Sequence, residues 1–143
     1  VWNEVVKEGR AFPQLDELTV ESGREFFASQ TFTAVAEKNG VIMGLYILHP
    51  NNIGRCGHLS NASFAVASYA RGQGIGEMLV RHCLDNAGKF GFKILQFNAV
   101  AASNKSAVAL YTKLGFERLG IVSGGFLNKD NEYEDIILFY HKV

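Results

Sequence analysis

The sequence predicts an α/β domain in which helices cover a mixed β-sheet. The main observation is the order of the patterns along the chain: two helical segments, a run of β-rich segments, then helix, strand, helix and two closing strands. The size agrees, because 143 residues of which 48% are hydrophobic and 20% charged suit one compact domain over residues 1–143. No second domain is needed to bury a core of this size.

The N-terminal half is expected to form two helices followed by three strands. The helical patterns cover residues 1–8 and 22–28, and Thr19 or Ser22 is the expected N-cap of the second helix. Asn39-Gly40 favours a primed hairpin turn between the first two strands. The expected strands are residues 32–37, 41–48 and 59–66, with a loop over residues 49–57.

The C-terminal half is expected to alternate helices and strands. An apolar residue recurs every three or four positions up to Gly91 and marks one buried helical face. The residues of this face are Ile75, Leu79, Cys83, Ala87 and Phe90. A second helix, residues 104–114, ends at Gly115. The expected strands are residues 94–100, 116–122 and 133–140, with a glycine-rich loop over residues 123–125. That loop is a candidate for the acceptor pocket or for a dimer surface, while Phe126 and Tyr133 are candidates for the core.

The charge balance and the hydropathy pattern argue against several classes of protein. Fourteen basic and fourteen acidic residues leave no net charge, so no nucleic-acid partner is expected. No apolar run approaches the roughly 18 residues that a membrane helix requires. The two cysteines, Cys56 and Cys83, are too few for a disulfide framework. We therefore expect a cytoplasmic protein with free thiols and no membrane partner.

The most informative motif is Arg71-Gly72-Gln73-Gly74-Ile75-Gly76, which follows the expected strand 59–66 and precedes a helical pattern. Glycines at alternate positions let the backbone approach a bulky ligand and adopt φ values that a side chain would forbid. The helix that follows directs free N–H groups and the positive end of its dipole at the same place. The motif therefore predicts a phosphate or pyrophosphate site.

Spacing excludes two familiar phosphate-binding motifs. A dinucleotide fingerprint requires a third glycine three residues after the second, but Glu77 or Leu79 stands there, depending on which glycine pair is counted. An NTPase P-loop requires Gly-Lys followed by Ser or Thr, which this loop lacks. What remains is R-x-x-G-x-G at a strand-to-helix turn.

A second motif lies downstream, where residues 104–116 read N-x-x-A-x-x-L-Y-x-x-L-G-F. The two motifs, in this order and separated by one helix and one strand, resemble the signatures of the GNAT (GCN5-related) N-acetyltransferase family. The resemblance extends from about Trp2 to Tyr140. Within the family, Leu48-His49-Pro50-Asn51, residues 54–58, Asn61 and Gln96-Phe97-Asn98 resemble a branch that includes a fungal enzyme acetylating azetidine-2-carboxylate, a proline analogue, and many small bacterial relatives.

The resemblance implies a mostly antiparallel sheet that splays at its centre. The strands that end at Val66 and start at Ile94 would separate there and receive the pantetheine arm of CoA. Members of the family usually begin with a strand before the first helix. Because this chain begins with Val1 directly before a helical pattern, we expect that an N-terminal strand is missing from the sequence.

Acetyl-CoA is the implied co-substrate, and no metal is implied. By resemblance, the backbone of residues 73–76 holds the pyrophosphate with help from Arg71. The implied CoA-binding residues are Val66, Arg71, Gly72, Gln73, Gly74, Ile75, Gly76 and Asn104. Asn104 has a second explanation, because asparagine is also among the best N-cap residues and a helix is expected to begin directly after it.

The resemblance also assigns two catalytic groups. The backbone N–H of Phe64 would donate to the developing oxyanion, and the Tyr111 hydroxyl would serve the departing thiolate. Ordinary pKa values of about 10 for tyrosine and about 8.5 for a thiol make full proton transfer uphill by roughly 2 kcal/mol. A hydrogen bond from Tyr111 to the thiolate is therefore at least as plausible as proton donation, and a purely structural role as a half-buried aromatic is the alternative.

The general base is the least defined group. Many family members carry a glutamate four residues before the oxyanion position, but Ser60 occupies that place here. His58 lies nearby and imidazole accepts protons at neutral pH, so His58 is the candidate base. The alternatives are an exposed loop histidine without a role, a bound water, or an acceptor amine that is already partly neutral.

Asn61 and Asn98 lie on the two strands that are expected to separate. In the resembling branch the matching asparagines are taken to bind the acceptor, including its carboxylate. Asparagine is unfavourable in a central strand, so a polar partner is expected, either the substrate or a structural group. A buried amide without its ligand would leave donors unpaired, which favours the substrate.

These assignments predict an acetyl-CoA-dependent N-acetyltransferase with a small-molecule amine as the acceptor, such as an amino acid or an analogue. Two alternatives remain: acetylation of a protein N-terminus or lysine, and a CoA-binding sensor without turnover. The chain shows no acidic run that would attract a basic peptide. A homodimer is common among such folds and is a further expectation.

Overall fold

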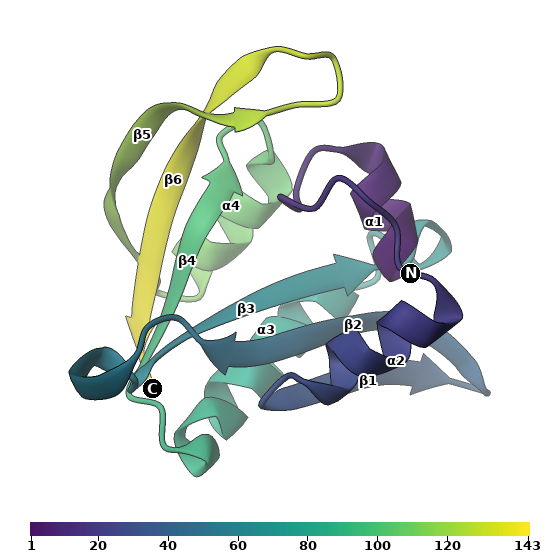
Figure 1. Cartoon of the computed structure of the whole chain (residues 1–143), viewed down its shortest axis with the longest axis horizontal. Coiled ribbons are helices and arrows are strands. Elements are labelled where there is room, and N and C mark those ends of the chain that lie inside the picture. Colours follow the sequence, from purple (N-terminus) through teal and green to yellow (C-terminus); the bar gives the residue numbers. More distant parts are fainter.

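The computed structural model describes all residues, 1–143, as a six-stranded sheet flanked by helices (Figure 1). The α-helices are α1 (Trp2–Glu8), α2 (Val20–Ala28), α3 (Ile75–Ala87) and α4 (Lys105–Lys113), and the 3₁₀ turns are η1 (Gly54–Cys56), η2 (Ser68–Ala70) and η3 (Gly88–Phe90). The strands are β1 (Phe32–Lys38), β2 (Val41–Pro50), β3 (Leu59–Val66), β4 (Ile94–Ala101), β5 (Glu117–Leu127) and β6 (Tyr133–Lys142). None of the helices is both long and apolar enough to cross a membrane.

The sheet consists of two halves that join at one end only. Its strand order is β1-β2-β3-β4-β6-β5, and every neighbouring pair is antiparallel except β3 and β4. The parallel pairing of β3 with β4 is limited to Leu59↔Ile94 and Ser60↔Leu95. Beyond these pairs the two strands diverge, as Figure 1 shows for the β1–β2–β3 and β4–β6–β5 halves. The predicted mixed, mostly antiparallel sheet that splays at its centre is confirmed.

Local sequence explains where several elements begin and end. Thr19 caps α2 by accepting a hydrogen bond from Ser22 N–H, while the Ser22 hydroxyl oxygen accepts from Thr19 N–H. The hairpin turn places Asn39 at φ 52° and Gly40 at φ 78°, which is the primed geometry expected of Asn-Gly. Gly91, at φ 86°, ends the helical segment formed by α3 and η3.

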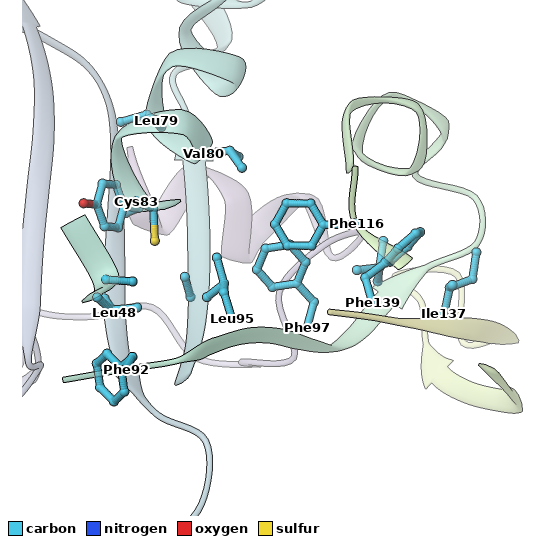
Figure 2. Packing of buried hydrophobic residues seen from close by; sticks show 14 of the residues in the cluster. Leu48, Leu79, Val80, Cys83, Phe92, Leu95, Phe97, Phe116, Ile137 and Phe139 are labelled. Atoms are coloured by element: carbon cyan, nitrogen blue, oxygen red, sulfur yellow. The ribbon is translucent and has the colours of Figure 1, made fainter. Parts of the chain in front are cut away.

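Two apolar cores lie on opposite faces of β2 and β3 because side chains alternate along a strand. The larger core joins the sheet to α3 and α4 and includes Tyr46, Leu48 and Cys83. Figure 2 shows part of it, with the stacked rings of Phe97 and Phe116, whose centroids are 4.9 Å apart. The smaller core packs α1 and α2 against the other face; its buried residues are Trp2, Val5, Val6, Phe12, Leu45, Ile47 and Ala65.

The structure corrects several predicted boundaries. Strand β2 continues through Pro50, so His49 lies in a strand and not in the expected loop. Residues 123–125 belong to β5, where the pairing with β6 shifts register between Val122 and Phe126, and they do not form a separate loop. Of the expected core residues, Phe126 is buried, but Tyr133 is 74% exposed and Phe90 is 39% exposed.

Candidate active site

A cavity of about 600 Å³ opens where β3 and β4 diverge. Its walls come from β3, β4, α4, the start of α3 with the loop before it, His49 of β2, and residues 11–14, which connect α1 to α2. Most residues of the two sequence motifs contribute to one continuous surface. The predicted site residues that line the cavity are Asn61, Phe64, Val66, Arg71, Gly72, Gly74, Ile75, Gly76, Asn98, Asn104 and Tyr111.

The glycine loop forms the N-terminal end of α3. Gly72 (φ 75°) and Gly74 (φ 78°) adopt the left-handed conformation that favours glycine, and Gly74 is the N-cap. Gly76 does not have a positive φ, and a Cβ there would meet its neighbours at ordinary distances, so this glycine is not required by backbone geometry. The Gln73 side chain turns away from the cavity and donates to Tyr69 O at 3.2 Å. The loop thus presents backbone N–H groups at the positive end of a helix.

Helix α1 holds this loop in place through two carboxylates. Arg71, which lines the cavity, is paired with Glu8 at 2.6 Å. The Glu4 carboxylate accepts from Ser68 N–H at 3.2 and 3.3 Å, and hydrogen bonding from Ser68 lowers the pKa of Glu4. The position of the loop therefore depends on residues more than sixty positions earlier in the chain.

The backbone N–H of Phe64 points into the gap between β3 and β4. At one end of the β2–β3 ladder Ala67 N–H donates to Met43 O at 2.9 Å, and at the other end Asn51 N–H donates to Leu59 O at 2.7 Å. Antiparallel pairs alternate between bonded and non-bonded, so odd-numbered residues of β3 direct their backbone groups to β2. The N–H of Phe64 faces the other side, where β4 has diverged and leaves it without a strand partner.

Tyr111 packs against the aromatic part of the larger core. Its ring lies 4.5 Å from that of Phe97 and 5.4 Å from that of Phe116, measured between centroids. Burial raises the pKa of the Tyr111 hydroxyl well above its ordinary value, so the group is protonated at neutral pH. A protonated hydroxyl at the cavity wall can donate a hydrogen bond but cannot act as a base.

Asn104 is the N-cap of α4, and capping uses only one of the two polar groups of its side-chain amide. Its Oδ1 accepts from Ala107 N–H at 3.3 Å and from the Ser106 hydroxyl at 3.1 Å. The amide N–H₂ group is not used by the cap. Because Asn104 lines the cavity, capping and ligand binding are compatible functions of one side chain.

A group of amides lies on the cavity wall formed by β3 and β4. Asn61 Nδ2 donates to Gln96 O at 2.8 Å. Asn98 Nδ2 donates to Asn51 Oδ1 at 2.6 Å, and Asn98 Oδ1 accepts from Asn51 at 3.2 Å and from Gln96 Nε2 at 3.1 Å.

The sequence-based argument for Asn98 is therefore wrong in one respect. Asn98 is exposed rather than buried, and both asparagines find protein partners, so unpaired donors do not demand a ligand. Each asparagine still keeps one free N–H, and Asn61 also keeps a free carbonyl oxygen. These are the hydrogen-bonding groups that the two side chains can offer to a ligand.

The two residues considered for the base position lie elsewhere. Ser60 is fully buried and its hydroxyl donates to Ile94 O at 2.8 Å, which is a structural bond between β3 and β4. His58 is exposed, precedes β3 and does not line the cavity, while its backbone oxygen accepts from Lys93 N–H at 2.9 Å. The structure does not bring the His58 side chain to the other predicted residues.

Two residues that the sequence analysis left without a role also line the cavity. His49 pairs with Asn61 across the β2–β3 ladder and reaches the same wall. Gln14, in the connection between α1 and α2, has a buried Oε1 atom without a hydrogen-bond partner. The register of the β2–β3 pairing would have identified His49, but this register is not apparent from the local sequence.

Sequence comparisons identify similar proteins. A model described as "Acetyltransferase (GNAT) family" matches residues 2–116. The N-acetyltransferase aca1 of Schizosaccharomyces pombe is 35% identical over 111 residues, which cover 76% of this chain and 53% of that protein. The chain thus spans about half the length of this curated relative.

Solved structures with the same fold include proteins from two bacteria. A GCN5-related N-acetyltransferase from Kribbella flavida is 33% identical, with a TM-score of 0.88 over 99% of this chain and 88% of that chain. A phosphinothricin acetyltransferase of the GNAT superfamily from Sinorhizobium meliloti, in complex with AcCoA, is 20% identical, with a TM-score of 0.89 over 99% of this chain and 79% of that chain. At the lower identity the likeness concerns the fold alone.

Proposed function

The chain belongs to the GNAT acetyltransferase family, and from this premise we propose that it is an acetyl-CoA-dependent N-acetyltransferase that acts on a small-molecule amine, such as an amino acid or an analogue. The observation that carries the proposal is the single cavity between β3 and β4, which joins the glycine loop, Tyr111 and the asparagine pair. One wall offers groups for an anionic co-substrate and another offers groups for a polar acceptor.

The residues around the glycine loop fit CoA. A pyrophosphate needs several N–H donors in a concave arrangement, and the backbone of residues 72–76 provides them at the start of α3. Arg71 adds a positive charge, while Val66 and Ile75 offer apolar contact for the pantetheine arm. The free amide of Asn104 can donate to the arm from the other side. The bound thioester supplies an activated acetyl group.

Two groups of the chain fit the chemistry of acetyl transfer. The N–H of Phe64 faces the open gap and can donate to the carbonyl oxygen that gains negative charge as the amine adds. An oxyanion donor of this kind supplies about 2.7 to 4 kcal/mol in other enzymes. The Tyr111 hydroxyl, whose pKa is raised further by burial, is protonated and can donate a hydrogen bond to the departing sulfur.

The acceptor wall fits an amine that also carries a carboxylate. The free N–H groups of Asn61 and Asn98 can donate to a carboxylate, and Gln14 Oε1 and Asn61 Oδ1 can accept from an amine. No aspartate or glutamate lines the cavity, so the carboxylate of such an acceptor meets no negative charge that would repel it. This favours an amino-acid-like acceptor over a lysine side chain or a polyamine, which bring only positive charge to this region.

The test is CoA release from acetyl-CoA, measured with a thiol reagent against amino acids, proline analogues, simple amines and one basic peptide. We expect turnover with amino-acid-like acceptors. Turnover with the peptide alone would assign protein acetylation, and tight CoA binding without turnover would assign a sensor. The exposed thiol of Cys56 reacts with the same reagent, so each rate requires an enzyme-only baseline.

The asparagine pair gives the substrate assignment its own test. We expect Asn98→Ala to raise KM for the acceptor and to leave acetyl-CoA binding unchanged, because Asn98 lies on the acceptor wall and not at the glycine loop. Asn52→Ala is a matched control, because Asn52 is an exposed asparagine of the nearby turn outside the cavity. An unaltered KM in Asn98→Ala would contradict the assignment.

The proposal includes a homodimer formed through the β5 edge of the sheet. β5 is an edge strand of 11 residues with Leu119, Ile121 and Val122 each about half exposed, at 52%, 60% and 47%. A long apolar edge of this kind favours pairing with a second copy. Light scattering should give the mass of a dimer for the wild type and of a monomer for Ile121→Lys. A monomeric wild type would refute the proposed dimer.

A further inference from the structure

We infer that His49 is the general base that removes the proton from the acceptor's ammonium group. The inference rests on the proposed function and identifies a residue for the step that the family resemblance leaves open. It is drawn from what lines the cavity, from the hydrogen bond that orients the imidazole, and from the register of β2 against β3.

Elimination among the cavity residues supports His49. Three ionisable side chains line the cavity: His49, Arg71 and Tyr111. A guanidinium group has donors only, and that of Arg71 is paired with Glu8. The Tyr111 hydroxyl is protonated at neutral pH, and burial raises its pKa further. His49 is therefore the one lining side chain with a ring-nitrogen lone pair that can accept a proton.

A hydrogen bond defines which nitrogen of His49 is available. Nδ1 lies 3.0 Å from Pro50 O. A carbonyl oxygen can only accept, so Nδ1 carries the hydrogen and donates it. In the neutral imidazole the other nitrogen, Nε2, then has the free lone pair that a base requires. The bond thus holds the tautomer and the ring orientation that proton removal needs.

The strand register gives His49 a suitable place relative to the Phe64 N–H. His49 lies directly opposite Asn61, so the two side chains share one face of the sheet. Asn61 is three residues before Phe64, which is about 10 Å along the strand. His49 lies one strand further from the gap, so in this proposal a bridging water links the acceptor amine to the imidazole, and a general base can act through such a water.

The protons and bonds balance without a further reactant. The ammonium group gives one proton to Nε2 of His49 and becomes a nucleophilic amine. The amine nitrogen bonds to the acetyl carbon, the bond from that carbon to sulfur breaks, and the second proton of the amine passes to the departing thiolate. The net products are the N-acetyl compound, CoA with a free thiol, and one proton, which His49 passes to the solvent.

The test uses His49→Asn in the 143-residue chain. An asparagine amide can replace Nδ1–H as the donor to Pro50 O, but it has no counterpart of the basic Nε2. His141→Asn is the matched control, because His141 Nδ1 also lies against the carbonyl of the next residue, Lys142, away from the cavity. His58→Asn tests the competing histidine.

We expect His49→Asn to lower kcat/KM for the acceptor about 100-fold at pH 7. The loss should shrink by up to tenfold per pH unit as the pH rises, because the amine then loses its proton in solution and needs no base. CoA affinity, measured by calorimetry, and the thermal midpoint should stay at the wild-type values, and His141→Asn should keep the wild-type rate profile.

Three results would overturn the inference. The first is His49→Asn activity within twofold of wild type from pH 6 to 9, and the second is a loss of the same size at every pH, which would indicate a structural role. The third is a pH-dependent loss in His58→Asn with normal His49→Asn. If the wild-type protein acetylates an acceptor, each of these results leaves the proposed function intact. A wild-type protein without turnover on any acceptor would overturn both the proposed function and the role of His49.

Discussion

Replacing Gly74 by alanine should weaken CoA binding far more than it weakens the fold. Gly74 caps α3 at φ 78°, and a Cβ built there would meet no protein atom within 4 Å. The only structural cost is therefore the left-handed conformation, about 1–2 kcal/mol for a residue with a Cβ. This strain exists with and without ligand, so it lowers stability but does not by itself change affinity.

The effect on affinity comes from the ligand side of the loop. Gly74 lines the cavity and an added methyl group would meet no protein atom, so it would compete for space with a phosphate that accepts hydrogen bonds from the loop. Losing one hydrogen bond to a charged group costs about 1.5–3 kcal/mol. At 1.4 kcal/mol for each factor of ten, the dissociation constant of CoA should rise roughly 10- to 150-fold.

Gly40→Ala is the matched control for this prediction. Gly40 has the same φ of 78° and the same open surroundings, but it lies in the β1–β2 turn. Urea unfolding should show the same loss of stability in both variants, and calorimetry with CoA should show weaker binding only in Gly74→Ala. If Gly74→Ala binds CoA like the wild type, or if both variants bind equally weakly, the assignment of the loop is refuted.

Four further predictions follow from the surroundings of single residues. Gly44→Ala should destabilise the protein by about 1–3 kcal/mol, because its Cβ would lie 2.8 Å from a backbone oxygen of β3; Gly120→Ala, with nothing within 4 Å, is the control, and equal urea midpoints would contradict the packing argument. Tyr111→Phe should lower kcat about 10- to 150-fold at unchanged acetyl-CoA affinity if its hydroxyl serves the thiolate, and wild-type turnover would remove that role. Burial raises the pKa of the Cys83 thiol to about 12. The protonated thiol should therefore contribute its full stability below the ordinary thiol pKa, and this contribution should be lost as the pH rises toward 12. Urea unfolding of Cys83→Ala should show a flatter alkaline decline than the wild type, and an identical decline would contradict this. A thiol reagent should titrate only the exposed Cys56 in the native protein and both thiols in denaturant.

Several features of the site could be predicted because they depend on short segments. Glycines on either side of Gln73 require only local geometry, and the helix after them follows from its apolar period. Asn104 was expected as an N-cap for the same reason, since capping joins a side chain to the next turn of its own helix. Such contacts join residues only a few positions apart, so the local sequence is enough to predict them.

The candidate base could not be predicted from short segments. His58 is close to Phe64 in sequence but lies outside the cavity, whereas His49 is brought to the wall by its pairing with Asn61. Ending β2 two residues early in the prediction placed His49 in a loop. An error of this size at a strand end removes a residue from the sheet, and the face that each strand residue presents depends on register.

The sequence by itself determined the elements, the glycine loop before α3, the capping residues and the class of fold, because these follow from local periods and conformational preferences. Only the tertiary structure decided which groups face the gap between β3 and β4: the free N–H of Phe64, the paired amides of Asn61 and Asn98, and the imidazole of His49. The physical reason is that the pairing of strands far apart in the chain sets the phase of their hydrogen bonds and side chains, and no local property of the sequence specifies that phase.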